Sequence, residues 1–446
     1  MKNSSQAIKK VTSPFRYAIG MFGTSIPINM FKTYAAIFYV DTLGLNTNRY
    51  ALVLFIYTFV DAIDNPVYGF LSDRTRTKWG RRRPWMVIGT PLLVLSFILF
   101  FTPPASLEGQ SLFIYMLLMY ILTGTLDSLI NANYGALFPE LFPSEVQRAK
   151  SNSMRQAFQL VAMIVSIALT PMVTKQIGYS NTAIVYGLLA LVVILYCSLG
   201  CHENPQAVEM EKPQLWSSLK ALFVNSHFWI FGLANAFYSA ALVLVMQGVP
   251  FFIKYTLKVD EGKTTLMLGS VLVVAITSVA VWVGIVKKIT LMPTWRTALL
   301  ILTLGLIPMY FVTGLGGAIA VSSVVGFGVA GVLVTMDMVG ARIMDEDTKK
   351  YGLRREGIYS SAMGFMNRLN GLFTSLAFVL VNRVYGFESG DVPGPNPGGA
   401  ARFLLIIFPF FCMILSCVFA FLLHFKEDTN QEAKVEQVTE KPLDAQ

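Results

Sequence analysis

The sequence predicts an all-α integral membrane protein with about twelve transmembrane helices. Of its 446 residues, 54% are hydrophobic and only 14% are charged, whereas a soluble domain has about 25% charged residues. A membrane-spanning helix needs about 20 mostly apolar residues, so a chain of this length holds about twelve such segments with short loops. In the run from Asp61 to Trp85, two carboxylates lie inside an apolar segment and a dense block of arginines follows. A soluble protein has little use for such a run.

The apolar segments form two groups of six along the chain. The first group is predicted at residues 15–40, 49–72, 84–103, 111–139, 154–175 and 182–201. The second group is predicted at residues 227–253, 265–287, 295–313, 317–341, 358–385 and 400–424. A polar stretch separates the groups, and the polar chain end of mixed charge is typical of disorder. We therefore predict an N-terminal bundle at 1–201, a cytoplasmic linker at 202–226, a C-terminal bundle at 227–424 and a disordered cytoplasmic tail at 425–446.

Basic residues predict how the chain is oriented in the cell membrane. The loop after the second segment carries six of them, and short loops rich in Lys and Arg remain in the cytoplasm. They are Arg74, Arg76, Lys78, Arg81, Arg82 and Arg83. An even number of spans then places both termini in the cytoplasm. The net charge of +9 is explained by this topology and by anionic lipid, so we expect no nucleic-acid partner. We expect a monomer.

The second segment contains a candidate site for a coupling cation. A charge at the centre of a membrane helix costs about 2.5 to 3.5 kcal/mol, so such residues are usually functional. At about 100° per residue, Asp61, Asp64 and Asn65 share one helix face, where their oxygens can converge on Na⁺ or H⁺. The alternative is that the carboxylates form salt bridges with Lys32 or an arginine and only hold helices together. No other cofactor and no metal site is expected.

Four blocks resemble the glycoside-pentoside-hexuronide cation symporters of the major facilitator superfamily. They are Phe38–Leu45 (FYVDTLGL), Asp61–Trp85, Asn133–Phe158 and Tyr351–Leu369. The resemblance implies two six-helix bundles and cation-coupled symport of a sugar, glycoside or uronide by alternating access. The family pattern in the second helix is Asp, two residues, Asn, Asp, Pro, whereas this chain has Asp64 before Asn65. This reversal leaves Na⁺ and H⁺ equally open as the coupling cation.

The resemblance also implies residues that contact the solute. Ser25 stands where the family has a sugar-binding aspartate, and Lys32 is the charged residue of that helix instead. Asn131 stands at the second sugar-binding aspartate, one turn after Asp127. Arginines at two inward-facing basic positions favour an acidic sugar, because a guanidinium grips a carboxylate or paired hydroxyls; the alternative is charge balance against the aspartates. The predicted substrate-binding residues are Lys32, Asp127, Asn131, Tyr134, Arg155, Asp337 and Arg368.

Charged residues in two loops predict a cytoplasmic gate of ion pairs, with a merely solvated face as the alternative. They are Glu140, Arg148, Arg354 and Glu356. A membrane enzyme is disfavoured, because the three histidines lie near segment ends and no Cys or Glu cluster accompanies them. The nearer alternative is a major facilitator carrier of an amphiphile such as a lysolipid or drug.

Overall fold

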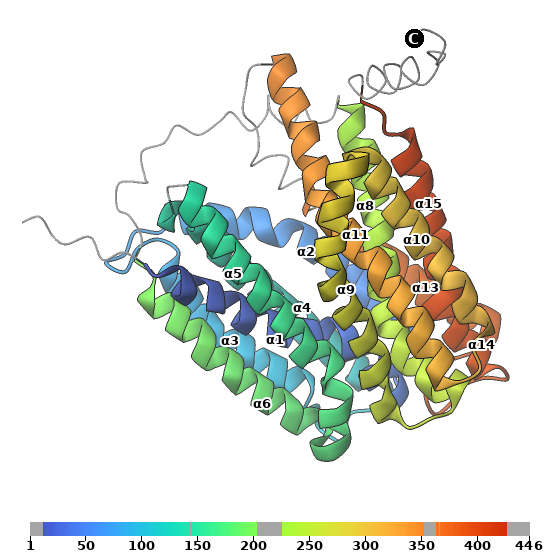
Figure 1. Ribbon diagram of the computed structural model, residues 1–446. Coiled ribbons are helices and arrows are strands. Elements are labelled where there is room, and N and C mark those ends of the chain that lie inside the picture. The colour runs from blue at the N-terminus through green and yellow to red at the C-terminus, as the bar shows by residue number, and fades with distance from the viewer. Residues whose placement is uncertain (1–11, 143–144, 203–224, 352–362, 365, 426–446) are drawn as a thin grey trace, which may run out of the picture.

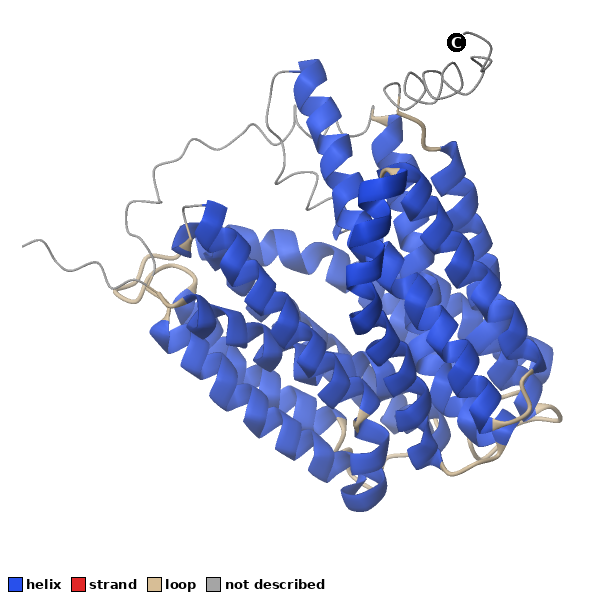
Figure 2. Cartoon of the chain, viewed as in Figure 1, coloured by secondary structure: helices blue, strands red, loops and turns tan. Residues whose placement is uncertain are grey.

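The protein is an all-α membrane protein, and the described helices form twelve membrane spans. The structure, a computed structural model, describes residues 12–142, 145–202, 225–351, 363–364 and 366–425. Within those ranges every regular element is a helix, and no strand is present apart from one isolated bridge between Thr77 and Gly80 (Figure 2). The predicted fold class is therefore confirmed.

The first six spans follow one another through short turns. They are α1 with the π-helical η1 (Pro14–Ala36, Ile37–Thr42), α2 (Thr47–Arg74), α3 (Arg83–Phe100), α4 (Gly109–Leu141), α5 with η2 (Glu145–Met163, Ile164–Ala168) and α6 (Thr170–Gly200). The chain turns within α6 at Gly178, which has φ 78° and ψ 167°. Only glycine adopts this conformation readily. No neighbouring atom lies within 4 Å of the place a Cβ would take, so the requirement is conformational rather than steric.

The second six spans begin after the predicted linker, which lies largely outside the described residues. They are α8 with η4 (Ser226–Phe251, Phe252–Leu257), η5 with α9 (Glu261–Lys263, Thr264–Ile289), α10 (Leu291–Phe311), α11 (Leu315–Tyr351), α13 (Asn370–Tyr385), and α14 with η6 and α15 (Pro397–Arg402, Phe403–Ile407, Phe408–Leu422). Asn225 caps α8 by accepting from the Phe228 amide at 3.3 Å, which satisfies one donor of the first turn.

Eight helices of the described chain are long and apolar enough to cross a membrane by length and composition alone. The spans outside this group are formed by α1, α2 and α5, which contain polar or charged residues, and by α13, which has only 16 residues. Polar residues in a span are costly in lipid, so they are expected where helices face one another or a water-filled space. Three of these four spans line the cavity described below.

Helix contacts divide the molecule into two halves (Figure 1). In the N-terminal half α1 packs on α5 and α6, and α3 packs on α4 and α6; in the C-terminal half α11 packs on α9 and α10, and α8 packs on α15. The largest contact between the halves is that of α2 with α13. Figure 1 shows the halves diverging toward the end that carries the loop after Arg74, here named the basic end. They converge at the other end, near α14, here named the closed end.

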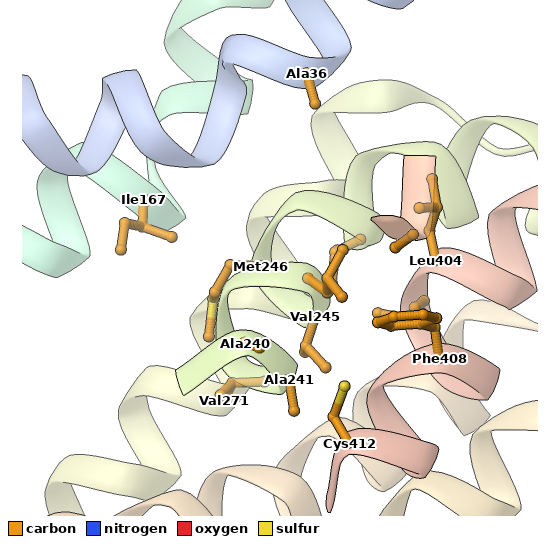
Figure 3. Packing of buried hydrophobic residues seen from close by; sticks show 14 of the residues in the cluster. Ala36, Ile167, Ala240, Ala241, Val245, Met246, Val271, Leu404, Phe408 and Cys412 are labelled. Atoms are coloured by element: carbon orange, nitrogen blue, oxygen red, sulfur yellow. The ribbon is translucent and has the colours of Figure 1, made fainter. Parts of the chain in front are cut away.

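The apolar core of the C-terminal half is built around α8. Ala241, Val245 and Met246 of this helix are buried, and Leu404 and Phe408 pack on it from η6 and α15 (Figure 3). Gly248 allows the close approach, because a Cβ there would lie 3.0 Å from the backbone of Leu405. This packing fixes α8 beside the boundary between the halves.

The halves are joined at the closed end by backbone hydrogen bonds. The Thr47 amide donates to the Glu388 carbonyl at 2.7 Å, and the Gly390 amide donates to the Val40 carbonyl at 2.9 Å. Gly390 must be glycine for this contact, because a Cβ would lie 2.0 Å from the carbonyl oxygen of Asp41.

Candidate functional site

A cavity of about 400 Å³ lies between the two halves. Helices α1, α2 and α4 line it from one half, and α8 with α13 and the turn before it line it from the other. Its volume is within the range of about 300 to 1,000 Å³ that is usual for ligand sites. The lining residues are Lys32, Leu54, Tyr57, Thr58, Asp61, Tyr120, Asp127, Ser128, Asn131, Ala132, Val243, Gln247, Gly364, Asn367, Arg368, Asn370, Gly371 and Thr374.

Two carboxylates of α2 are held by two hydroxyls of α4. Ser128 Oγ donates to Asp61 Oδ1 at 3.2 Å, and Thr125 Oγ1 donates to Asp64 Oδ2 at 2.9 Å. Asp61 and Asp64 are three residues apart on one face of α2, and Thr125 and Ser128 are three residues apart on one face of α4, so these two helix faces meet here. Carboxylate and hydroxyl oxygens together suit a hard cation or a proton. No group of three or more His, Cys, Asp or Glu residues in the described chain could hold a metal ion, so these donors do not form a multi-carboxylate cage.

Arg368 connects the two halves at this site. Its Nε lies 2.9 Å from Asp61 Oδ2, and the two side chains are 16% and 17% exposed. Arg368 lies directly before a break in the helix, since the Leu369 amide donates to the carbonyl of Met366, three rather than four residues back. Interrupted helices of this kind occur at transport sites, where they bring polar groups and backbone to the solute.

Lys32 and Asp127 both line the N-terminal wall of the cavity and form no ion pair with each other. The Lys32 side chain is exposed about one turn before α1 ends at Ala36. It is close enough for its charge to act on Asp127, although the ion pairs found among the described residues include none between the two. Asp127 is buried, and its Oδ1 accepts from Asn131 Nδ2 at 2.7 Å. The predicted Lys32, Asp127, Asn131 and Arg368 are therefore brought together.

Three predicted substrate-binding residues are not part of the cavity lining. Tyr134 is 2% exposed, stacks on Tyr17 with ring centroids 4.5 Å apart, and exchanges hydroxyl-to-carbonyl hydrogen bonds with it at 2.9 Å. The Arg155 guanidinium lies over the Phe138 ring, 5.2 Å from its centroid. Asp337 is exposed on α11. Tyr134 and Arg155 thus join helices within the N-terminal half rather than contacting the cavity.

The predicted gate and one predicted cation ligand lie outside what the structure describes. Arg354 and Glu356 belong to an undescribed segment, and the side chains of Glu140 and Arg148 are likewise undescribed. Asn65 lies in α2, but its side chain is also outside the described set. These assignments remain predictions.

An ion-pair cluster joins the halves at the closed end. Lys254 Nζ contacts Asp41 Oδ2 at 2.5 Å and Glu261 Oε1 at 3.5 Å, and the Tyr255 hydroxyl donates to Asp41 Oδ1. The Asp41 side chain is only 2% exposed. Lys175 forms a second pair with Asp260 across the same boundary, and this ammonium holds the pKa of the Asp260 carboxyl below its usual value. We refer to Asp41, Lys254, Tyr255 and Glu261 as the closed-end cluster.

Several site residues were missed in the sequence. Thr125 and Ser128 repeat the spacing of Asp61 and Asp64, which is a signal visible only when α2 and α4 are known to be neighbours. The polar residues of the C-terminal wall had a simpler signal, because they interrupt otherwise apolar segments. They are Gln247, Asn367 and Asn370.

Several transport proteins are similar in sequence to most of this chain. An isoprimeverose transporter of Lactiplantibacillus pentosus is 26% identical, with 84% of this chain and 82% of that protein covered. The inner membrane symporter YicJ of Escherichia coli K12 is 24% identical, with 93% and 91% covered. A glucuronide carrier protein homolog of the same organism is 22% identical, with 90% of each chain covered.

Solved structures share the fold at low sequence identity. The nucleoside transporter NupG superposes with a TM-score of 0.68 at 12% identity, with 93% of this chain and 99% of that chain covered. A bacterial homolog of the human lysosomal transporter Spinster, in an inward-facing and unoccupied conformation, gives 0.66 at 13% identity, with 92% and 97% covered. Residues 16–427 match the family described as MFS/sugar transport protein. The chain therefore belongs to the MFS/sugar transport protein family and is a multi-pass membrane carrier, not an enzyme.

Proposed function

We propose that the protein is a cation-coupled symporter of a sugar or glycoside, working by alternating access through the cavity between its halves. The observation that carries the proposal is the lining of this cavity. Among the described lining residues, the aliphatic side chains are only those of Leu54, Ala132 and Val243, and Tyr57 and Tyr120 add aromatic surface. Hydroxyl, amide and charged groups supply most of the rest, as a solute rich in hydroxyls requires.

The same lining disfavours the amphiphile carrier that the sequence left open. An acyl chain or a drug-sized apolar group needs contiguous apolar surface, because burying polar groups against it without hydrogen bonds costs free energy. The names of the relatives, a transporter of isoprimeverose and a glucuronide carrier homolog, also favour sugars. The tyrosines Tyr57 and Tyr120, with ring centroids 5.0 Å apart, offer the flat apolar surface that a sugar ring needs.

The proposed coupling depends on competition for Asp61. Arg368 occupies one oxygen of this carboxylate, so a cation binding there must displace the guanidinium. The displaced guanidinium is then available to the solute, because its fork of donors suits hydroxyl or carboxylate oxygens. Cation binding thus favours solute binding, and by linkage solute binding favours cation binding to the same degree. Both Na⁺ and H⁺ suit the oxygen donors.

We place the basic end and both termini in the cytoplasm. The arginine loop after α2 supports this orientation under the positive-inside rule. The closed end then faces outward, and the conformation is an inward-facing one in which the closed-end cluster blocks access from outside. Because the cavity lies between the two halves of the same chain, we propose that the protein transports as a monomer.

The closed-end cluster is expected to set the balance between inward-facing and outward-facing states. Lys254→Gln leaves Asp41 without its cation and should shift the equilibrium outward by about 1 kcal/mol, or about fivefold, a value reduced because Lys254 is 35% exposed. The readout is labelling of Ala132→Cys in the cavity by a membrane-impermeant thiol reagent added from outside. The four native cysteines are buried. Lys258→Gln is the matched control at the same end, and equal labelling rates in both variants would contradict the assignment.

Uptake by membrane vesicles tests the proposed function. Right-side-out vesicles with an imposed Na⁺ or pH gradient should accumulate a labelled sugar or glycoside above its external concentration. Collapse of accumulation by a proton uncoupler at fixed Na⁺ identifies H⁺, and dependence on Na⁺ with the uncoupler present identifies Na⁺. Uptake of a lysolipid, with no sugar accumulated, would refute the proposal.

A further inference from the structure

Lys32 is an ammonium group placed where a membrane protein rarely leaves one. It lies about one turn before α1 ends at Ala36, inside the span that α1 forms with η1, and its side chain is exposed to the cavity. The other cation of the cavity, Arg368, is in contact with Asp61 at 2.9 Å. Lys32 has no such contact with a carboxylate in the described chain, although the buried Asp127 lies within range of its charge.

This placement has a consequence when a solute fills the cavity. The solute displaces the water that solvates the Lys32 ammonium, and an ammonium taken out of water without a counter-charge costs several kcal/mol. Asp127 compensates poorly, because its Oδ1 is already hydrogen-bonded to Asn131 and it lies beyond direct contact. A neutral sugar offers Lys32 only hydroxyl oxygens, whereas a carboxylate offers a full charge and two acceptors.

Gln247 of the opposite half provides a second unsatisfied group near Lys32, a side-chain oxygen without a hydrogen-bond donor. Its Nε2 donates to the Lys32 carbonyl oxygen at 2.8 Å, which fixes which amide atom is the nitrogen. Its Oε1 is buried and has no hydrogen-bond partner, and the residue is 3% exposed and lines the cavity. A buried acceptor left without a donor is unfavourable, and a donor on the solute would remove this penalty.

From these two groups we infer that the solute is a sugar bearing a carboxylate, a uronide or its glycoside. Lys32 binds the carboxylate, and Gln247 Oε1 accepts a hydrogen bond from a ring hydroxyl. The inference rests on the proposed sugar transport and narrows its substrate class. It makes Lys32 the residue that separates acidic from neutral sugars, while Gln247 contributes to binding both.

Two ligands that differ only at C6 test this assignment in purified protein reconstituted into liposomes. Methyl β-D-glucuronide carries the carboxylate, and methyl β-D-glucoside carries a hydroxymethyl group in its place. The wild-type protein should bind the glucuronide at least tenfold more tightly. Lys32→Gln should weaken glucuronide binding about tenfold, or about 1.4 kcal/mol, and leave glucoside binding within about twofold. Lys32→Arg should retain most of the preference.

Matched variants separate the role of Lys32 from general damage. Lys287→Gln, at an exposed lysine of the basic end, should change neither affinity. Gln247→Met should weaken both ligands to a similar degree. An equal loss of both ligands in Lys32→Gln, or equal wild-type affinity for the two, would overturn the inference.

Further uptake and competition experiments distinguish failure of this inference from failure of the proposed function. Accumulation of the glucoside without the glucuronide overturns the carboxylate assignment and leaves sugar symport standing. Accumulation of neither of these sugars, nor of any other labelled sugar or glycoside, overturns both. Glycolate, a carboxylate without a sugar ring, should compete weakly, and competition as strong as that of the glucuronide would overturn the assignment of a sugar.

Discussion

Asp61→Asn is expected to abolish gradient-driven accumulation of the solute. The amide keeps the shape and can still accept from Ser128, but it has no charge to balance a bound cation or the Arg368 guanidinium. Without cation binding at this position, the free energy of the cation gradient is no longer coupled to solute movement. Accumulation against a gradient in vesicles should fall to the equilibrium level, which is a complete loss rather than a reduced rate.

Equilibrium exchange provides the control for this variant. If Asp61 acts in coupling, downhill exchange of solute should survive to a larger extent than accumulation, because solute binding and the change of access remain. Asp337→Asn removes a carboxylate on the exposed face of α11, outside the cavity lining, and should accumulate solute normally. Wild-type accumulation by Asp61→Asn would remove this residue from the coupling site.

The spans were predictable from apolar length, but their polar extensions were not. The fifth span was predicted from residue 154, whereas α5 begins at Glu145, and the tenth was predicted to end at 341, whereas α11 continues to Tyr351. Both extensions are at the basic end and are rich in charge. These extensions are helical beyond the apolar part of each span, where hydropathy does not indicate a helix. Only periodicity and helix propensity could have predicted them, and both are weaker signals than hydropathy.

The charged members of the site were predictable because charge in a membrane span is costly and therefore conspicuous. Hydroxyls are less costly there, so Thr125 and Ser128 did not stand out. Tyr134 was misplaced for a different reason. Tyr134 follows Asn131 by three residues and lies on roughly the same face of α4. However, α4 packs on α1 there, and Tyr134 stacks on Tyr17. Two residues on the same helix face can therefore have different neighbours, as Asn131 and Tyr134 do. Helix packing decides this, and a single sequence does not reveal it.

Which charges pair could not be derived from the sequence either. The sequence offered four aspartates and three basic residues inside helices, with several pairings open. Asp61 and Arg368 are about 300 positions apart and meet only because α2 lies against α13 at the boundary between the halves. The pairing therefore depends on how the two halves are docked, and a change of access that moves them apart must alter it.

A double-mutant cycle on Asp61 and Arg368 should show that the two charges depend on each other. Arg368→Gln leaves the Asp61 carboxylate 17% exposed without its cation, and breaking a mostly buried pair from one side costs about 3 kcal/mol. The thermal unfolding midpoint of this variant in detergent should therefore fall by several degrees. Asp61→Asn combined with Arg368→Gln removes both charges, so much of the lost stability should return, with a coupling free energy of about 2 kcal/mol.

Transport separates this stabilising role from function. The double variant should remain unable to accumulate solute even where its stability approaches that of the wild type, because neither the cation nor the guanidinium exchange is available. Arg296→Gln is a suitable control, since this arginine donates to carbonyl oxygens of Ala420 and Leu423 far from the cavity. Arg296→Gln should lower the thermal unfolding midpoint, and adding Asp61→Asn should not restore it. If the effects of Arg368→Gln and Asp61→Asn simply add, the 2.9 Å contact carries no coupling, and the proposed exchange of Arg368 for a cation loses its physical basis.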